Sequence, residues 1–332
     1  MKNKKNFNFS LKLGRRKSFV QDLLLIEGIS RAGKFLVANL LHGFKGIEPI
    51  QYYGLLEHVP YLEKFRLIDK HTAQEILKCE VDIHCYEMLI GRNLNYRKDD
   101  KSSIFNIPNY KKFLKRSVEP DGNYAVEKLR GEKLCSSFIV HELLPNIKIY
   151  FDTFSRLKVI SVLRSPIYLV YSWYQRGLGK RFGDDPILFS IPLELKGKNV
   201  PWFTAGWEKQ FLELSEMDRN IASIEWLMHA SEKSYRLLSP KNKKKILFIN
   251  YEQILMHPDM LIEKISKFLK RPIMEKDMKM ILKYEKLPNL EYSDSKQDKL
   301  SLIKEKSSKL YYNKLLVLEN EYVSKEENNE KH

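Results

Sequence analysis

A short segment near the start of the chain, residues 28–34, combines two glycines with the cations Arg31 and Lys34. Four apolar residues precede it at positions 23–26, a run that is typical of a buried parallel strand. Apolar side chains recur at helical spacing after it, so the sequence predicts a strand, a tight loop and a helix. Such a loop directs backbone N–H groups and the positive end of a helix dipole at one point. We therefore predict that this loop binds a phosphate or a sulfate.

The loop matches most of the nucleotide-binding pattern in which Gly, four residues, Gly and Lys are followed by Ser or Thr. Phe35 stands where the hydroxyl that holds Mg²⁺ should be. The segment therefore fits a metal-free anion site better than a Mg-dependent NTPase, and we expect no metal. An ordinary strand-to-helix turn with surface cations is the alternative that this segment alone leaves open.

Composition restricts the class of protein. The chain has 332 residues, 43% of them hydrophobic, which suits one large domain or two ordinary ones. A formal net charge of +16 indicates an anionic partner, without choosing among nucleotides, sulfated or phosphorylated substrates, nucleic acid and acidic lipid. The three cysteines form no CxxC pair, and no apolar run suits a signal peptide or a transmembrane segment. We expect a cytoplasmic protein, and the oligomeric state stays undetermined.

The chain divides into three predicted parts. Residues 1–20 form a basic arm that we expect to be flexible, and residues 21–292 form the main domain. Residues 293–332 suggest one helix followed by a polar tail. Within the main domain, strong strand patterns alternate with helical ones, which favours an α/β fold with a mainly parallel sheet.

Two segments of the main domain carry mixed signals. Residues 72–89 suit a helix that passes into a short strand around residues 81–85. Residues 177–207 place glycines and prolines between charged residues, which predicts a long ordered loop. Long loops in compact domains are usually functional.

Three predicted strands end in residues that can do chemistry. One leads into the anion loop, a second ends at His141, and a third ends at Arg164. Because parallel sheets bind ligands at the carboxyl ends of their strands, these residues are expected to share one edge. Ser172 follows Arg164 on the next predicted helix, so the guanidinium and the hydroxyl suit a second phosphate. Pairing of Arg164 with a local carboxylate is the alternative.

Residues 157–174 resemble the 3′-phosphate-binding segment of the sulfotransferases that use 3′-phosphoadenosine 5′-phosphosulfate (PAPS). In that family an apolar strand, an Arg, a turn that often contains Pro and a helix with a Ser follow one another. Residues 28–36 resemble the family's 5′-phosphosulfate loop, and residues 141–145 are similar to its catalytic histidine segment. Residues 246–252 resemble its late strand. The four matches occur in the order of the family.

The resemblance implies a P-loop-like three-layer α/β fold and transfer of a sulfuryl group from PAPS to an acceptor hydroxyl. It implies that Arg31 stabilises charge on the leaving phosphate and that His141 is the general base. Glu142, Glu27 and His84 stay alternative bases. The cofactor-binding residues are then Gly28, Ser30, Arg31, Ala32, Gly33, Lys34, Phe35, Arg164 and Ser172. Ala32, Lys34 and Phe35 depart from the family's hydroxyl residues.

The acceptor is predicted to be a small molecule or a glycan, and no specific nucleic-acid partner is expected. A P-loop kinase acting on a small molecule is a second possibility. It would need a hydroxyl after Lys34 and an Asp at the end of an apolar strand. A non-enzymatic protein that binds nucleic acid or a membrane surface, through the arm or through the lysine run at 241–245, is a third.

Overall fold

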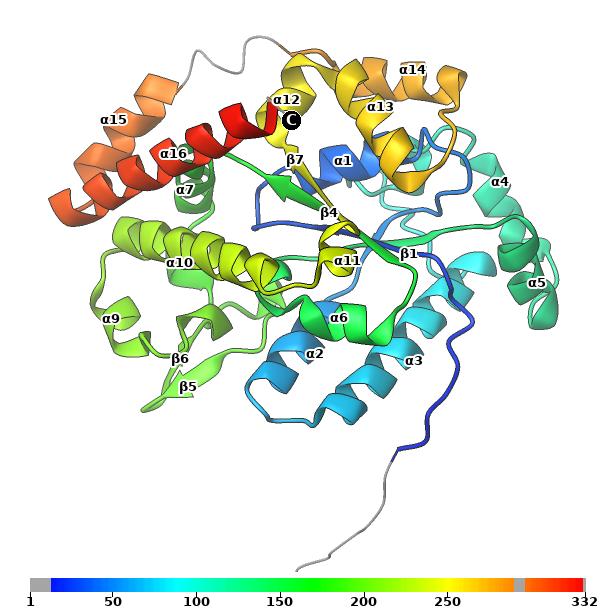
Figure 1. Cartoon of the computed structure of the whole chain (residues 1–332), viewed down its shortest axis with the longest axis horizontal. Coiled ribbons are helices and arrows are strands. Elements are labelled where there is room, and N and C mark those ends of the chain that lie inside the picture. Colours follow the sequence, from blue (N-terminus) through cyan, green and yellow to red (C-terminus); the bar gives the residue numbers. More distant parts are fainter. Residues whose placement is uncertain (1–12, 290–295, 331–332) are drawn as a thin grey trace, which may run out of the picture.

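The computed structural model describes residues 13–289 and 296–330. A sheet of five parallel strands forms its centre, and Figure 1 labels β1, β4 and β7 there. The order of the five strands in the sheet is β2-β3-β1-β4-β7, and every neighbouring pair is parallel. The carboxyl ends of all five strands therefore meet at one edge. The strands are β1 (Leu23–Glu27), β2 (Gln51–Tyr52), β3 (Ser136–Ile139), β4 (Leu157–Leu163) and β7 (Ile246–Asn250).

Helices cover both faces of this sheet, so the predicted three-layer α/β fold with a mainly parallel sheet is confirmed. The longer helices are α1 (Lys34–Leu41), α2 (Leu55–Lys64), α3 (Lys70–Leu89), α5 (Asn123–Gly131), α7 (Pro166–Gln175), α10 (Glu216–Arg236), α13 (Pro258–Leu269), α14 (Glu275–Glu285), α15 (Lys296–Lys306) and α16 (Lys309–Glu330). The shorter ones are α4 (Lys111–Leu114), α6 (Lys148–Thr153), α8 (Leu178–Arg181), α9 (Glu208–Glu213), α11 (Pro240–Lys243) and α12 (Tyr251–Met256).

The alternation of side chains along β1 divides the hydrophobic core in two. Leu24 and Ile26 pack in a cluster with α1, α7, α10, α13 and α16. Leu23 and Leu25 pack in a second cluster with α2, α3 and α6 on the other face. β1 is the middle strand and is buried along its whole length, which agrees with the apolar side chains of its first four residues on both faces. The loop that follows β1 therefore starts from a rigid point.

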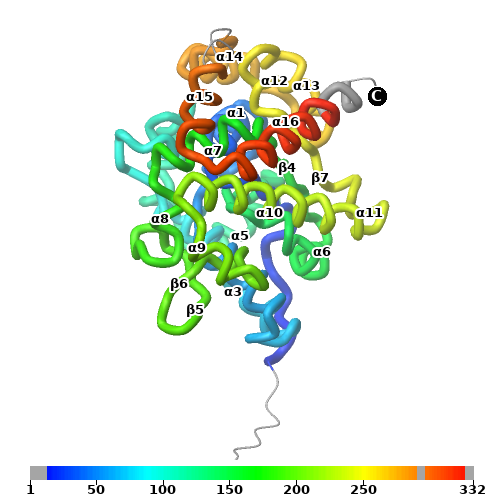
Figure 2. The backbone as a smooth tube through the Cα atoms, turned by 90° about the vertical axis from the view of Figure 1, so that its left-hand side faces the viewer, coloured from blue at the N-terminus to red at the C-terminus, as the bar shows by residue number. Residues whose placement is uncertain are grey.

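The two C-terminal helices belong to the main core. α15 packs against α7, and α16 packs against both α7 and α10 (Figure 2). The Glu319 carboxylate of α16 accepts hydrogen bonds from the Ser165 hydroxyl at 2.7 Å and from the Ile167 N–H at 3.3 Å. These groups form the N-terminus of α7, so a side chain from the far end of the chain caps a helix beside the carboxyl edge of the sheet.

Several local predictions differ from the structure. Residues 81–85 are not a strand, because α3 continues through them to Leu89. Residues 177–207 are not a plain loop: they contain α8, the hairpin strands β5 (Leu193–Leu195) and β6 (Lys198–Val200), and two short 3₁₀ turns. The predicted C-terminal helix is α16, and α15 precedes it.

The arm predicted at residues 1–20 is described from residue 13 onward, and residues 1–12 lie outside the described part. Arg16 forms an ion pair with Asp82 of α3 at 2.6 Å, and the Ser18 hydroxyl donates to the same carboxylate. No helix within the described ranges combines the length and apolarity needed to cross a lipid bilayer.

A buried ion pair fixes the segment that leads into β2. Arg116 donates to both carboxylate oxygens of Glu48, at 2.6 and 2.9 Å, and both side chains are 5% exposed. Truncating one partner leaves the other charge buried without compensation.

We expect Arg116→Ala to lower the free energy of unfolding by about 3–5 kcal/mol in urea denaturation. The control Arg97→Ala breaks an exposed pair with Asp100 and should cost less than about 1 kcal/mol. Equal losses in the two variants would contradict a structural role for the Glu48 pair.

Candidate functional site

The loop between β1 and α1 requires glycine at two positions. Gly28 has φ 150°, and a Cβ added there would lie 2.5 Å from the carbonyl oxygen of Val162. Gly33 has φ 99°, and a Cβ there would lie 2.1 Å from the ring of Tyr251. Any larger residue would push the loop away from β4 and from α12. Within the described chain, no side chain caps the N-terminus of α1 at Gly33, which leaves that terminus available to an anion.

The Lys34 side chain lies on the buried side of the loop and not on its solvent-facing side. Its ammonium is buried and donates to the carbonyl oxygens of Gly28 at 2.6 Å and Ile29 at 3.0 Å. Burial lowers the pKa of Lys34, and the carboxylates of Glu142 and Glu27 oppose that shift. In this arrangement the ammonium holds the loop backbone in place.

The remaining loop residues are positioned by their backbone and by packing. The Ser30 N–H donates to the Glu142 carboxylate, and its carbonyl accepts a hydrogen bond of 2.8 Å from the Trp173 indole of α7. Ala32 is buried, and its N–H closes the turn onto the Ile29 carbonyl at 2.9 Å. Phe35 packs against the hydrophobic core on the α1 side of the sheet.

Arg31, Arg164 and Ser172, which the sequence places far apart, meet at the edge of the sheet. The Arg31 side chain donates to the Ser172 hydroxyl at 3.1 Å. Arg164 donates to the Arg31 carbonyl at 2.7 Å, and its guanidinium lies 4.6 Å from the ring centroid of Tyr251. The predicted phosphosulfate loop and the predicted 3′-phosphate segment are thus in direct contact.

Two further cations, Arg176 and Lys299, interact electrostatically with this group. Partial burial lowers the pKa of Arg31, and the nearby guanidiniums of Arg176 and Arg164 lower it further. Partial burial also lowers the pKa of Lys299 on α15, again with a contribution from Arg164. Like charges that are held together repel one another, and a bound anion of high charge would relieve that repulsion. The residues present therefore fit a ligand that carries more than one phosphate or sulfate group.

His141 forms a hydrogen-bonded pair with Glu57 of α2. Its Nδ1 lies 2.7 Å from the Glu57 carboxylate, which also accepts the His141 backbone N–H. The Tyr52 hydroxyl donates to the other carboxylate oxygen at 3.2 Å, and the Tyr52 ring meets the imidazole edge-on. A carboxylate that accepts from Nδ1–H leaves Nε2 as a proton acceptor. The pair therefore has the chemistry of an oriented general base.

The three alternative bases lie in different environments. Glu27 is 2% exposed and accepts from the Ser161 hydroxyl and from the Leu144 N–H. Glu142 accepts the loop N–H of Ser30. His84 lies on α3 against the Tyr53 ring and within hydrogen-bond distance of Asn93, away from the loop. Of the two histidines among these candidates, only His141 has a carboxylate at a ring nitrogen in the described part of the chain.

Sequence reasoning missed several residues of this site: Tyr52, Glu57, Arg176, Tyr251 and Lys299. Arg176 had a detectable signal, because it lies four positions after Ser172 and so shares its helix face. Glu57 and Lys299 had none, since each reaches the site through the packing of a separate helix. Tyr251 was part of a family-like segment but had no assigned role.

A sulfotransferase domain model matches residues 44–318 of the chain. The chain belongs to the sulfotransferase family. The matched region includes His141, Arg164, Ser172 and Lys299, and it begins after the loop at residues 28–34. Family membership therefore indicates transfer of a sulfuryl group as the general reaction class of the chain. The described residues contain no group of three His, Cys, Asp or Glu that is suited to hold a metal ion.

This member of the sulfotransferase family is also similar to solved sulfotransferase structures. The sulfotransferase domain of the Synechococcus PCC 7002 olefin synthase has 13% identity and a TM-score of 0.41, and the match covers 82% of this chain and 80% of that one. The sulfotransferase domain from the curacin biosynthetic pathway has 12% identity and a TM-score of 0.41, with coverage of 86% and 98%. A comparison with curated proteins returns no match.

The buried carboxyl of Glu27 gives a testable dependence of stability on pH. Burial raises its pKa above 4.5, so above pH 4.5 the folded protein holds this proton more tightly than the unfolded chain does. Rising pH therefore favours unfolding through this group, until the folded-state pKa is passed. We expect Glu27→Gln to remove that contribution. The urea concentration at its unfolding midpoint should therefore increase relative to that of wild type as the pH rises from 4.5.

The control for this experiment is Glu132→Gln, which changes an exposed carboxylate. Its midpoints should follow those of wild type across the same pH range. Parallel curves for wild type and Glu27→Gln would show that Glu27 does not hold its proton in the folded state.

Proposed function

We propose that this protein transfers a sulfuryl group from PAPS to an acceptor hydroxyl, with His141 as the general base. The observation that carries the proposal is the contact of Arg31 with Ser172 and of Arg164 with the Arg31 carbonyl, next to the N-terminus of α1. The charges of Arg176 and Lys299 add to this group. The family membership supports the reaction class. PAPS supplies the activated sulfuryl group and carries a 3′-phosphate as a second anionic centre.

On the donor side, the loop, Arg31 and Arg164 have distinct roles. Arg31 and the backbone N–H groups of the loop bind the 5′-phosphosulfate and stabilise negative charge at the bridging oxygen. Arg164 and Ser172 bind the 3′-phosphate, with Lys299 as an additional cation. Lys34 supports the loop from beneath through the Gly28 and Ile29 carbonyls. Direct neutralisation of the donor by Lys34 stays a prediction.

On the acceptor side, His141 removes the proton. Glu57 holds the Nδ1–H of the imidazole, so that Nε2 is free to accept the proton of the acceptor hydroxyl. The same carboxylate stabilises the imidazolium that forms. The acceptor is a small molecule or a glycan.

The kinase alternative has less support. Phe35 follows Lys34 where a Mg²⁺-binding hydroxyl would be needed. None of the described parallel strands ends in an aspartate, and the residues that follow β3 and β4 include His141 and Arg164 instead. A site that binds anions by guanidinium groups suits a donor whose sulfuryl group is transferred without a metal.

The 3′-phosphate assignment predicts a selective loss of affinity. Arg164→Ala should weaken binding of adenosine 3′,5′-bisphosphate by about 10-fold or more, since hydrogen bonds to charged groups contribute about 1.5–3 kcal/mol. Binding of adenosine 5′-monophosphate, which lacks the 3′-phosphate, should change much less. Isothermal titration calorimetry measures both affinities.

Arg156→Ala is the matched control, because Arg156 lies at the opposite end of β4 and pairs with Asp22. It should bind both nucleotides as wild type does. If Arg164→Ala weakened the two nucleotides equally, the residue would act on the loop and not on the 3′-phosphate. Stabilisation of the wild-type protein by ATP·Mg alone would favour the kinase instead.

The general-base assignment predicts a loss of turnover with binding intact. His141→Ala should lower kcat by about 10²–10⁴-fold, while affinity for adenosine 3′,5′-bisphosphate stays close to wild type. His84→Ala is the matched control and should keep wild-type kcat. Wild-type kcat in His141→Ala would refute the assignment, and a loss in Glu142→Gln instead would transfer the role to Glu142.

A further inference from the structure

The turn that joins β4 to α7 is held by two carboxylates from other helices, and the proposed function uses neither of them. Glu319 of α16 accepts hydrogen bonds from the Ser165 hydroxyl at 2.7 Å and from the Ile167 N–H at 3.3 Å. Glu252 of α12 accepts the Ser165 N–H at 3.2 Å. The Ser165 and Glu319 side chains are both buried. Both donors of Ser165, its hydroxyl and its N–H, are thus bound by carboxylates from distant parts of the chain.

The two C-terminal helices support both of these carboxylates. The Tyr322 hydroxyl, one turn after Glu319 on the same face of α16, donates to the second oxygen of Glu252 at 2.7 Å. Lys296 of α15 forms an ion pair with Glu319 at 2.7 Å, which balances the buried charge. A carboxylate at the first turn of a helix is also favoured by the helix dipole. The turn before α7 is therefore held by charge-assisted hydrogen bonds, which are stronger than those between neutral groups.

This turn carries the two side chains that are assigned to the 3′-phosphate. Arg164 directly precedes Ser165, and its guanidinium donates to the Arg31 carbonyl at 2.7 Å. Ser172 lies seven residues after Ser165, about 10 Å further along the axis of α7. A shift or rotation of the first turn of α7 would move the guanidinium and the hydroxyl together. Because hydrogen bonds weaken steeply when their geometry is lost, the grip on a phosphate depends on this turn.

Glu319 also occupies a position that an anion could take. The N-terminus of a helix attracts anions, and at α7 the Glu319 carboxylate accepts the Ile167 N–H there. A phosphate that bound at this turn would have to displace a carboxylate that an ion pair with Lys296 holds in place. Recognition of a phosphate beside α7 is thus left to side chains, and Arg164 is attached directly to the turn that Glu319 fixes.

We propose that Glu319 is a positioning residue for binding of the 3′-phosphate. Its carboxylate fixes the Ser165 turn, the turn fixes Arg164 and the start of α7, and the affinity for the 3′-phosphate follows from that placement. Glu319 acts without touching the ligand. This inference rests on the proposed function, because it names a residue of α16 that sets the preference of the donor site for a nucleotide with a 3′-phosphate.

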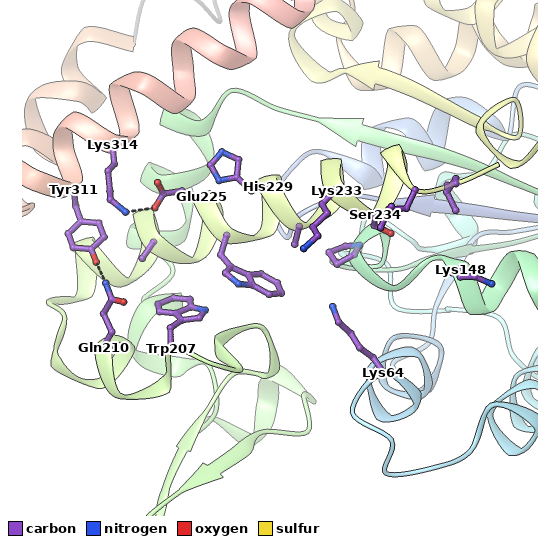
Figure 3. Close-up of a pocket in the computed structure, with 16 residues that line it drawn as sticks. Lys64, Lys148, Trp207, Gln210, Glu225, His229, Lys233, Ser234, Tyr311 and Lys314 are labelled. Carbon is purple, nitrogen blue, oxygen red and sulfur yellow. Dashed lines mark hydrogen bonds and ion pairs between the residues drawn. The ribbon is translucent and has the colours of Figure 1, made fainter. Parts of the chain in front are cut away.

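The test compares nucleotide binding by Glu319→Ala with that of a control on the same helix. Lys314→Ala removes an ion pair of 2.9 Å with Glu225, which joins α16 to α10 and not to α7 (Figure 3). Isothermal titration calorimetry measures the affinities for adenosine 3′,5′-bisphosphate and adenosine 5′-monophosphate. Glu319→Ala should weaken binding of the bisphosphate by about 5-fold or more and that of the monophosphate much less. Lys314→Ala should bind both nucleotides as wild type does.

Two further variants separate positioning from a general loss of structure. Glu319→Gln keeps an oxygen that can accept from the Ser165 hydroxyl but loses the ion pair with Lys296, so it should retain most of the affinity for the bisphosphate. Ser165→Ala should show the same selective loss as Glu319→Ala. The double variant should lose no more than Glu319→Ala alone, because the two residues act through one contact. If Glu319→Ala does not fold, Ser165→Ala provides the comparison with Lys314→Ala.

Several results would overturn the proposal. Equal weakening of the two nucleotides in Glu319→Ala would show that the carboxylate supports the fold in general. Additive losses in the double variant with Ser165→Ala would show that the two residues act independently. Tighter binding of the bisphosphate by Glu319→Ala would show that the carboxylate competes with the ligand for the N-terminus of α7.

The preference of wild type for the bisphosphate separates this proposal from the proposed function. If wild type prefers the bisphosphate to the monophosphate and Glu319→Ala keeps that preference, the positioning role fails and the donor site stands. If wild type binds the two nucleotides equally, the 3′-phosphate assignment of the proposed function fails, and the role of Glu319 fails with it.

Discussion

Lys34 places a positive charge beneath the loop, and the shape of the loop depends on it. A buried ammonium is costly unless its protons are hydrogen-bonded and its charge is balanced. Here the carbonyls of Gly28 and Ile29 accept its hydrogen bonds, and the nearby Glu142 carboxylate favours its positive charge. In a trans peptide the carbonyl and the following N–H point in opposite directions. The Ile29 carbonyl turns towards the ammonium, so the N–H of the next residue, Ser30, points the other way and donates to the Glu142 carboxylate. The cation thereby fixes the course of the backbone that leads into α1.

The cations that face outward come from three separate segments. Arg31 belongs to the loop, Arg164 and Arg176 flank α7, and Lys299 comes from α15. The parallel sheet explains why Arg31 and Arg164 meet, since they follow the neighbouring strands β1 and β4 at the same edge. Arg176 lies at the far end of α7 from Arg164. The fourth depends on the packing of α15 against α7. The position of Lys299 beside the other cations is consequently linked to the placement of the C-terminal helices.

Much of the fold follows from local sequence pattern, and the site follows in part. The apolar runs at β1 and β4 and the residues after them placed Arg31, Arg164 and Ser172 correctly at one edge, because parallel strands leave little freedom. Residues 81–85 were mispredicted because apolar and polar residues alternate there, which resembles a half-buried strand although the segment lies inside α3. Glu57 could not be found, since its contact with His141 depends on how α2 packs over the sheet. Tertiary packing decides such contacts, and no spacing in the sequence records them.

Glu319 and Ser165 are 154 positions apart, yet they meet at the first turn of α7. A contact of such long sequence separation forms only after the intervening chain has been closed into a loop, which has an entropic cost. The helix that carries Ser172 thus receives its cap from a segment that is synthesised much later than the strands around it. Any ligand that contacted both the loop and Lys299 would join the same early and late parts of the chain, and binding it would stabilise the folded state.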